Sequence, residues 1–204
     1  MGNTYHNITV KGPTHDEIVS YLDAQKQAAF VSPPLQDLTF VYSSDDVWTT
    51  LAEDLSRTFQ CPALFTSVYD GDILQYTLYD EGHCIDEYDS APDYFDGEDW
   101  GDEAEAEDTR PHQPEPAGGN AHLLCATFGV GQAVSQVEAI LHPPVEEAIR
   151  ASGIYGFEQH WALVEALGWP PLACITDYRH LERDDAVEDL EAMFAGASLV
   201  KTPR

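Results

Sequence analysis

The sequence predicts an α+β protein in which a mostly antiparallel N-terminal sheet with two helices is followed by a small helical C-terminal lobe. Three observations predict this class. Over residues 1–95, short strand-like apolar runs alternate with two helical patterns. Two tight turn signals near the end of this region join further strand-like runs. Beyond an acidic stretch with Pro and Gly at 96–119, apolar residues recur at helical spacing over 120–204.

The first elements predict the order strand, helix, strand, strand, helix, strand, as in a ferredoxin-like or split βαβ layer. Thr14 and Glu17 have the spacing of a capping box, which indicates the start of the first helix. Ser44 is the expected cap of the second helix, because two Asp residues follow it. The expected strands are 5–10, 28–31, 38–42 and 63–69, and the expected helices are 15–25 and 45–59.

A β-meander is expected to extend this layer. The segment Asp70-Gly71-Asp72 joins strands over 63–69 and 73–79, and Asp80-Glu81-Gly82 leads to a third strand over 84–88. Gly in such short connections adopts positive φ readily, which is typical of tight hairpins. The predicted sheet therefore gains two more antiparallel strands.

The C-terminal half is predicted to be mainly helical. A helix over 134–141 must stop at Pro143-Pro144, and a helix over 157–167 is closed by Gly168. A strand is expected over 172–178 and a last helix over 184–194. The predicted organisation is a sheet domain at 1–95, an acidic linker or loop at 96–119, and a mainly helical lobe at 120–204.

The net charge excludes two classes of partner. The chain has 37 Asp and Glu against 9 Lys and Arg, a formal net charge of −28. Direct nucleic-acid binding is not expected, because it depends on Lys and Arg that neutralise phosphates. Docking on anionic membranes is disfavoured for the same reason, and no apolar run approaches the ~20 residues of a membrane-spanning helix. The first residues lack the pattern of a secretory signal, so a cytoplasmic location is expected.

The function expected from this charge is non-enzymatic binding of a basic protein partner. No Lys or Arg occurs between Arg57 and Arg110, and 93–108 has nine acidic residues in sixteen positions. Aromatic anchors in a negative field suit a basic, partly apolar partner. The meander contributes Tyr69, Tyr76, Tyr79 and Tyr88. The expected partner-binding residues are Asp86, Glu87, Asp89, Asp93, Tyr94, Phe95, Asp96 and Trp100.

Two other interpretations of these features stay open. An acidic mimic of nucleic acid would present the same combination of charge and aromatic rings. Alternatively, the tyrosines pack a sheet and the acidity only keeps the protein soluble.

The acidic stretch also supplies oxygen ligands for a divalent cation. The candidate ligands are Asp93, Asp96, Glu98 and Asp99. The register of an EF-hand loop that starts at Asp93 fails, because its third position is Phe95. The prediction is therefore weak association with divalent cations and no specific cofactor.

The alternative to a binding protein is a metal-dependent or cysteine enzyme with a site in the cleft between the lobes. The sequence has no GxSxG, HExxH or P-loop motif. The candidate groups are a zinc set of His83, Cys84, His122 and Cys125, or the thiol of Cys125 or Cys174 with His160 or His180. Buried, reduced thiols are the plainer interpretation of the cysteines.

Several segments together resemble an uncharacterised family of bacterial proteins of similar length. They are KGPT at 11–14, LQYTLYDEGHCIDEYDSAPDYFDG at 74–97, HLLCATFG at 122–129, EQHWALVEALGWP at 158–170 and DYRHLE at 177–182. The resemblance covers most of the chain outside the linker. It implies a bacterial, cytosolic protein, and it implies no activity and no site residues.

Overall fold

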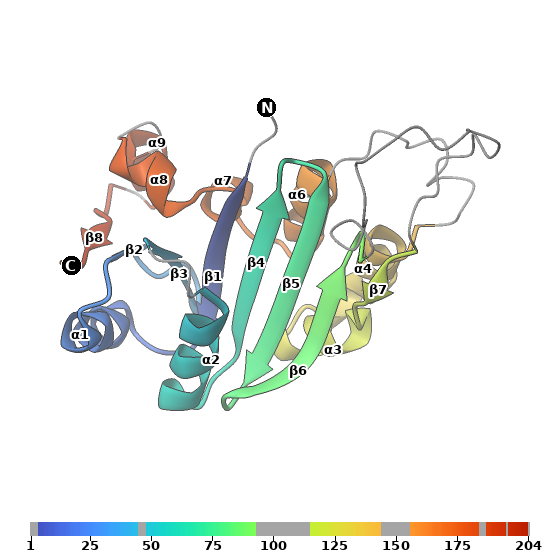
Figure 1. The fold of residues 1–204 in the computed structure, drawn as a ribbon, viewed down its shortest axis with the longest axis horizontal. Helices are drawn as coiled ribbons and strands as arrows, with labels where there is room; N and C mark the ends of the chain where they lie inside the picture. Colours follow the sequence, from blue (N-terminus) through green and yellow to red (C-terminus); the bar gives the residue numbers. More distant parts are fainter. Residues whose placement is uncertain are drawn as a thin grey trace, which may run out of the picture.

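The computed structural model describes residues 4–44, 48–92, 115–143, 156–183, 187–194 and 196–203. Its described strands form one eight-stranded sheet in the order β7-β6-β5-β4-β1-β3-β2-β8. Every neighbouring pair in the sheet is antiparallel. Helices lie on both faces of the sheet (Figure 1). The predicted α+β class is confirmed.

The first six elements have the predicted ferredoxin-like topology. They are β1 (Tyr5–Lys11), α1 (His15–Gln25), β2 (Ala29–Val31), β3 (Leu38–Ser43), α2 (Trp48–Phe59) and β4 (Ala63–Tyr69). Their strands lie in the order β4-β1-β3-β2, so that β3 separates β1 from β2. Each of the two helices connects strands that are not neighbours in the sheet, as a split βαβ arrangement requires.

The capping box at the start of α1 is present. The Thr14 hydroxyl accepts from the backbone N–H of Glu17, and the Glu17 carboxylate accepts from the backbone N–H of Thr14 at 2.8 Å. Hydrogen bonds from Thr14 hold the pKa of Glu17 below its ordinary value. The cap fixes where the chain leaves β1 and enters the helix.

The meander is also as predicted and consists of β4, β5 (Ile73–Asp80) and β6 (His83–Asp89). A β-bulge shifts the register of β5 and β6 between Leu78 and Tyr79. At the β5–β6 hairpin, Gly82 has φ +79°, and a Cβ there would lie 2.6 Å from the Cβ of Arg57 on α2. The hairpin can therefore pack this closely against α2 only with glycine at this position.

Two short strands complete the edges of the sheet. At one edge, β7 (Ala117–Gly118) pairs with the end of β6, and at the other β8 (Val200–Lys201) pairs with β2. The two residues of β7 fall within 96–119, where the sequence predicts a linker. The Thr202 hydroxyl accepts from the backbone N–H of Ala29 at 2.8 Å and anchors β8.

The C-terminal half is helical, with one correction. Its helices are α3 (Ala121–Phe128), the 3₁₀ turn η1 (Gly131–Ala133), α4 (Val134–Leu141), α6 (Gly156–Ala166), α7 (Pro171–Cys174), α8 (Tyr178–Glu182) and α9 (Val187–Met193). The strand expected over 172–178 is wrong. Pro171 instead begins a helix, where its fixed φ and missing N–H are tolerated, and Asp177 caps α8 by accepting from the N–H of His180 at 2.9 Å.

The sheet separates two hydrophobic layers. Side chains of β1 alternate between them, with Ile8 and Val10 packed under α1 and α2 and Tyr5 packed under the C-terminal helices. The cluster on the second face joins Leu78 of β5 to residues of the C-terminal helices, including Leu124 and Leu163. The N-terminal sheet and the C-terminal helices therefore share one hydrophobic core.

Among the described helices, none combines the length and the hydropathy that crossing a bilayer requires.

Candidate functional site

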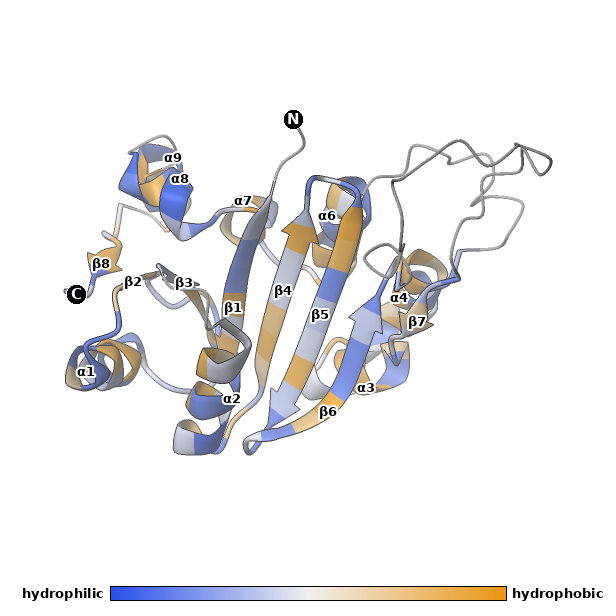
Figure 2. Ribbon diagram, viewed as in Figure 1, coloured by the Kyte–Doolittle hydropathy of each residue, from blue (hydrophilic) through white to orange (hydrophobic). Residues whose placement is uncertain are grey.

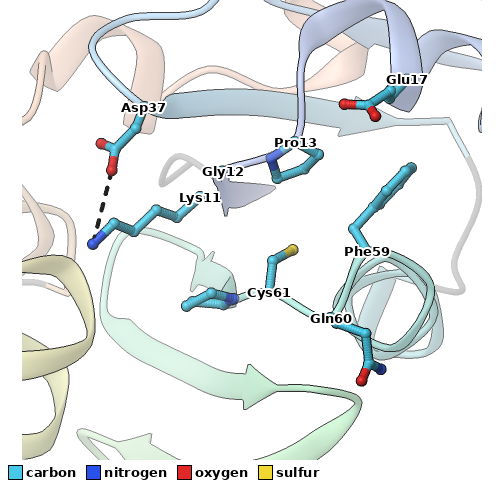
Figure 3. Close-up of a pocket in the computed structure, with 9 residues that line it drawn as sticks. Lys11, Gly12, Pro13, Glu17, Asp37, Phe59, Gln60 and Cys61 are labelled. Atoms are coloured by element: carbon cyan, nitrogen blue, oxygen red, sulfur yellow. Dashed lines mark ion pairs between the residues drawn. The ribbon is translucent and has the colours of Figure 1, made fainter.

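A surface pocket lies where the ends of β1 and α2 meet the β2–β3 connection (Figure 3). Its volume is about 470 Å³, and its lining includes Lys11, Glu17, Asp37, Phe59 and Cys61. A second pocket of about 400 Å³ lies at the first turn of α1.

The charged groups of the larger pocket already have partners within the chain. The Lys11 ammonium donates to the carbonyl oxygen of Thr127 at 3.0 Å and lies 3.8 Å from the Asp37 carboxylate. The Glu17 carboxylate is held by the capping box. The Cys61 sulfur points toward the turn at Gly12 and Pro13 (Figure 3). Burial raises the pKa of this thiol to about 11, so the thiol is protonated at pH 7. These groups hold the fold together and are poorly suited to attack or bind a substrate.

The candidate thiols of the enzyme hypothesis and the His160 imidazole lie in the core, whereas the His180 side chain is 43% exposed and its Nδ1 lies 2.7 Å from the Asp177 carboxylate. Cys174 is 1% exposed and His160 is 2% exposed. Burial raises the pKa of the Cys174 thiol and of the Cys125 thiol, and it lowers the pKa of His160 to about 3. A protonated thiol is a poor nucleophile, since the thiolate is the reactive form. The geometry therefore does not provide an activated cysteine at either position.

The zinc candidates do not meet at one point. His122 is exposed on α3 whereas Cys125, one turn later, is fully buried. His83 and Cys84 are both exposed at the start of β6. Within the described ranges, no group of three or more His, Cys, Asp or Glu side chains could hold a metal ion. The divalent-cation candidates Asp93, Asp96, Glu98 and Asp99 lie outside the described residues.

Asp86 holds two elements together. Its carboxylate accepts from the Tyr76 hydroxyl at 2.7 Å and from the backbone N–H of Asn120 at 2.8 Å. Asn120 is the N-cap of α3, and its side chain accepts from the N–H of Leu123. Asp86 therefore connects β6 to the start of α3 on the side of the sheet that the C-terminal helices cover.

Glu87 and Asp89 point to the opposite side. On the neighbouring strand β5, Glu87 is paired with Thr77 and Asp89 with Gln75. The Asp89 carboxylate accepts from the Gln75 amide at 2.6 Å and from the backbone N–H of Ala91 at 2.8 Å. Glu87 is exposed. The structure therefore places two of the three described partner-binding candidates on one face and separates Asp86 from them.

These two acidic residues belong to a part of the sheet that no described helix covers. In Figure 1, β5 and β6 turn one face to the viewer, and α2 meets them at the β5–β6 hairpin. We call this region the open sheet face and define it by its six outward-pointing side chains. They are Ser67, Tyr69, Gln75, Thr77, Glu87 and Asp89. Tyr69 is 44% exposed.

The hairpin turns of this region and β6 carry negative charge without Lys or Arg. Between Arg57 and Pro92 there are seven acidic residues and no Lys or Arg. Arg57 forms ion pairs with Glu53 and Asp54 of its own helix. Figure 2 shows β6 as a mostly hydrophilic strand. Within 58–92, no Lys or Arg balances this negative charge beside the open sheet face.

The remaining partner-binding candidates are Asp93, Tyr94, Phe95, Asp96 and Trp100, which lie outside the described residues. The described residues that flank this stretch, Pro92 and Glu115, follow β6 and precede β7. The chain therefore leaves and returns at the same edge of the sheet.

The four tyrosines that the sequence predicts as one set of aromatic anchors differ in burial in the structure. Tyr76 and Tyr88 are buried beneath the C-terminal helices, with ring centroids 5.5 Å apart, and the Tyr88 hydroxyl donates to the carbonyl oxygen of Leu141. Tyr79 is 8% exposed and only Tyr69 is accessible. Side chains alternate between the two faces along β5, so the sequence could have placed Tyr76 and Tyr79 on opposite faces of the sheet. No feature of the sequence indicated that Gln75 would lie beside Asp89.

Comparison with known proteins identified no relative of this chain. No protein-family model matches the chain, and no significant match was found among curated proteins or solved structures.

Proposed function

We propose that this chain is a non-enzymatic binding protein for a basic protein partner. The observation that carries the proposal is the acidic character of β6 and of the two hairpin turns beside the open sheet face, in a segment without Lys or Arg from 58 to 92. A surface of one charge sign attracts an opposite partner over about a Debye length and speeds its association. The proposal assigns binding to 86–108, where Glu87 is exposed and Asp89 is half-buried on the open sheet face.

The proposal includes a reducing, cytosolic setting and no cofactor. All four cysteines, Cys61, Cys84, Cys125 and Cys174, are free thiols. Unbridged cysteines fit a reducing compartment, where disulfides are rare.

Isothermal titration calorimetry with a 12-residue peptide rich in Lys and Arg tests the proposal. At about 150 mM salt, where diffuse ion binding is screened, we expect saturable binding at a fixed stoichiometry. A Glu-rich peptide of the same length is the matched control and should give no binding. Absence of saturable heats with the basic peptide would contradict the proposal.

A further inference from the structure

The open sheet face combines two kinds of group that recognise a guanidinium. Tyr69 presents an accessible aromatic ring at the end of β4. Glu87 and Asp89 present carboxylates on the same face, two strands away. Tyr69 is paired with Ile73, and Asp89 and Glu87 are paired with Gln75 and Thr77, which lie two and four positions further along β5. With about 4.8 Å between neighbouring strands and about 3.4 Å per residue, the backbone of Tyr69 lies about 12 Å from that of Asp89 and about 17 Å from that of Glu87. Side chains of one extended segment can bridge these distances.

The Asp89 carboxylate is held in one orientation before any partner arrives. The Gln75 amide donates to Oδ2 and the Ala91 N–H donates to Oδ1. Each carboxylate oxygen can accept a second hydrogen bond. Because the group is already ordered, a partner loses less conformational freedom of this side chain on binding.

A guanidinium suits these groups better than an ammonium. It donates two parallel hydrogen bonds to a carboxylate and stacks on aromatic rings, whereas Lys offers a compact, strongly hydrated charge. We propose that the open sheet face binds an arginine-rich segment of a protein partner through Tyr69, Glu87 and Asp89. This inference rests on the proposed function and specifies its surface and the chemistry of its partner.

The test compares nona-arginine and nona-lysine peptides by calorimetric titration of the full chain at about 150 mM salt. We expect nona-arginine to bind at least threefold more tightly. The double variant E87Q/D89N should weaken nona-arginine binding about tenfold, which is about 1.4 kcal/mol. The matched control E138Q removes the same charge from an exposed position on α4, on the other side of the sheet, and should change affinity less than twofold. Circular dichroism melting confirms that each variant is folded.

The aromatic part has its own test. Tyr69→Thr keeps a strand-forming residue at an exposed position and should weaken nona-arginine binding about threefold, with a smaller effect on nona-lysine. Equal affinities for the two peptides, together with no effect of Tyr69→Thr, would overturn the arginine assignment.

The experiment distinguishes an error in the assigned binding surface from an error in the proposed function. If nona-arginine binds but E87Q/D89N behaves like E138Q, the open sheet face is not the binding surface, although binding of a basic partner stands. If neither peptide binds, the proposed function fails. If E87Q/D89N instead dissociates a dimer in sedimentation experiments, a second copy of this chain covers the face and the inference is overturned.

Discussion

The Tyr5 hydroxyl and the His160 Nδ1 lie 2.7 Å apart, although 155 positions separate these residues along the chain. Their rings stack with centroids 5.6 Å apart, and both residues are almost fully buried. Tyr5 belongs to β1 and His160 to α6, so this hydrogen bond joins the first strand to the C-terminal helical layer. Burial keeps the imidazole neutral, with its pKa lowered to about 3.

The buried imidazole predicts a loss of stability in acid. In the unfolded chain, His160 has its ordinary pKa near 6.5 and binds a proton at a pH where the folded protein does not. The free energy of unfolding should therefore fall as the pH decreases from 6.5 toward 3, by at most about 1.4 kcal/mol per pH unit. Urea unfolding at several pH values should show a smaller slope for His160→Gln than for the wild type. His180→Gln, at a side chain that is 43% exposed, is the control, and identical slopes for His160→Gln and the wild type would contradict the account.

Asn7 is predicted to hold the C-terminal helices against β1. Its amide donates to the carbonyl oxygen of Cys174 and, at 3.3 Å, to that of Thr176. Asn7→Ala leaves both carbonyls without this donor and should lower the free energy of unfolding by about 1–3 kcal/mol. Hydrogen exchange should speed up in α7 and α8 more than elsewhere. Thr77→Ala on the open sheet face serves as the control, and equal exchange in the two variants would count against this role.

Gly156 is predicted to be irreplaceable because α6 begins against the backbone of β5. A Cβ at this position would lie 2.4 Å from the carbonyl carbon of Ile73 and 2.6 Å from the nitrogen of Leu74. Gly156→Ala should therefore lower the free energy of unfolding by about 2 kcal/mol, as overpacking does. At Gly131 a Cβ would have no atom within 4 Å, so Gly131→Ala should be neutral or slightly stabilising. A chemical denaturation series that ranked the two variants in the opposite order would refute this packing.

The four thiols are predicted to differ in reactivity. Cys84 is exposed, whereas Cys61, Cys125 and Cys174 are buried. Partial burial and the nearby Glu87 carboxylate raise the pKa of the Cys84 thiol, so less thiolate is present at pH 8 than in a free peptide. A disulfide reagent should therefore label one cysteine in the native protein, slowly, and the variant Glu87→Gln should react faster. Rapid labelling of two or more thiols in the native state would contradict the burial pattern.

The N-terminal fold was predictable because its signals are local. The Thr14 and Glu17 capping box starts α1, and short turns with Gly71 and Gly82 form the two hairpins. Each of these features requires only a few consecutive residues. Their order along the chain then restricts the possible sheet topologies to few, and the ferredoxin-like one is present.

Elements that depend on distant contacts were not predictable. Two-residue strands such as β7 and β8 are too short to show a period, and their pairing depends on contacts such as Thr202 with Ala29. The run 172–178 is apolar like a strand, yet Pro171 and Asp177 begin helical turns there. Periodicity alone does not distinguish a short buried helix from a strand.

In the candidate site, too, some features were predictable from the sequence and others were not. The acidic character of the region was evident from composition, and Glu87 and Asp89 were identified as candidates. Their separation from Asp86 follows from the alternation of side chains along β6. Which of the two sets faces the C-terminal helices depends on the β-bulge in the pairing of β5 and β6, which shifts the register of the two strands. A register change moves side chains to the other face of a sheet, and no signal in the sequence marked this position.

The salt dependence of peptide binding tests the central claim most directly. Nona-arginine is titrated into the full chain at about 50, 150 and 500 mM salt. If an acidic surface binds a basic partner, the affinity must decrease steeply at each step, because screening weakens exposed charge interactions. An affinity that does not change with salt, or no saturable binding even at the lowest salt concentration, would contradict the account.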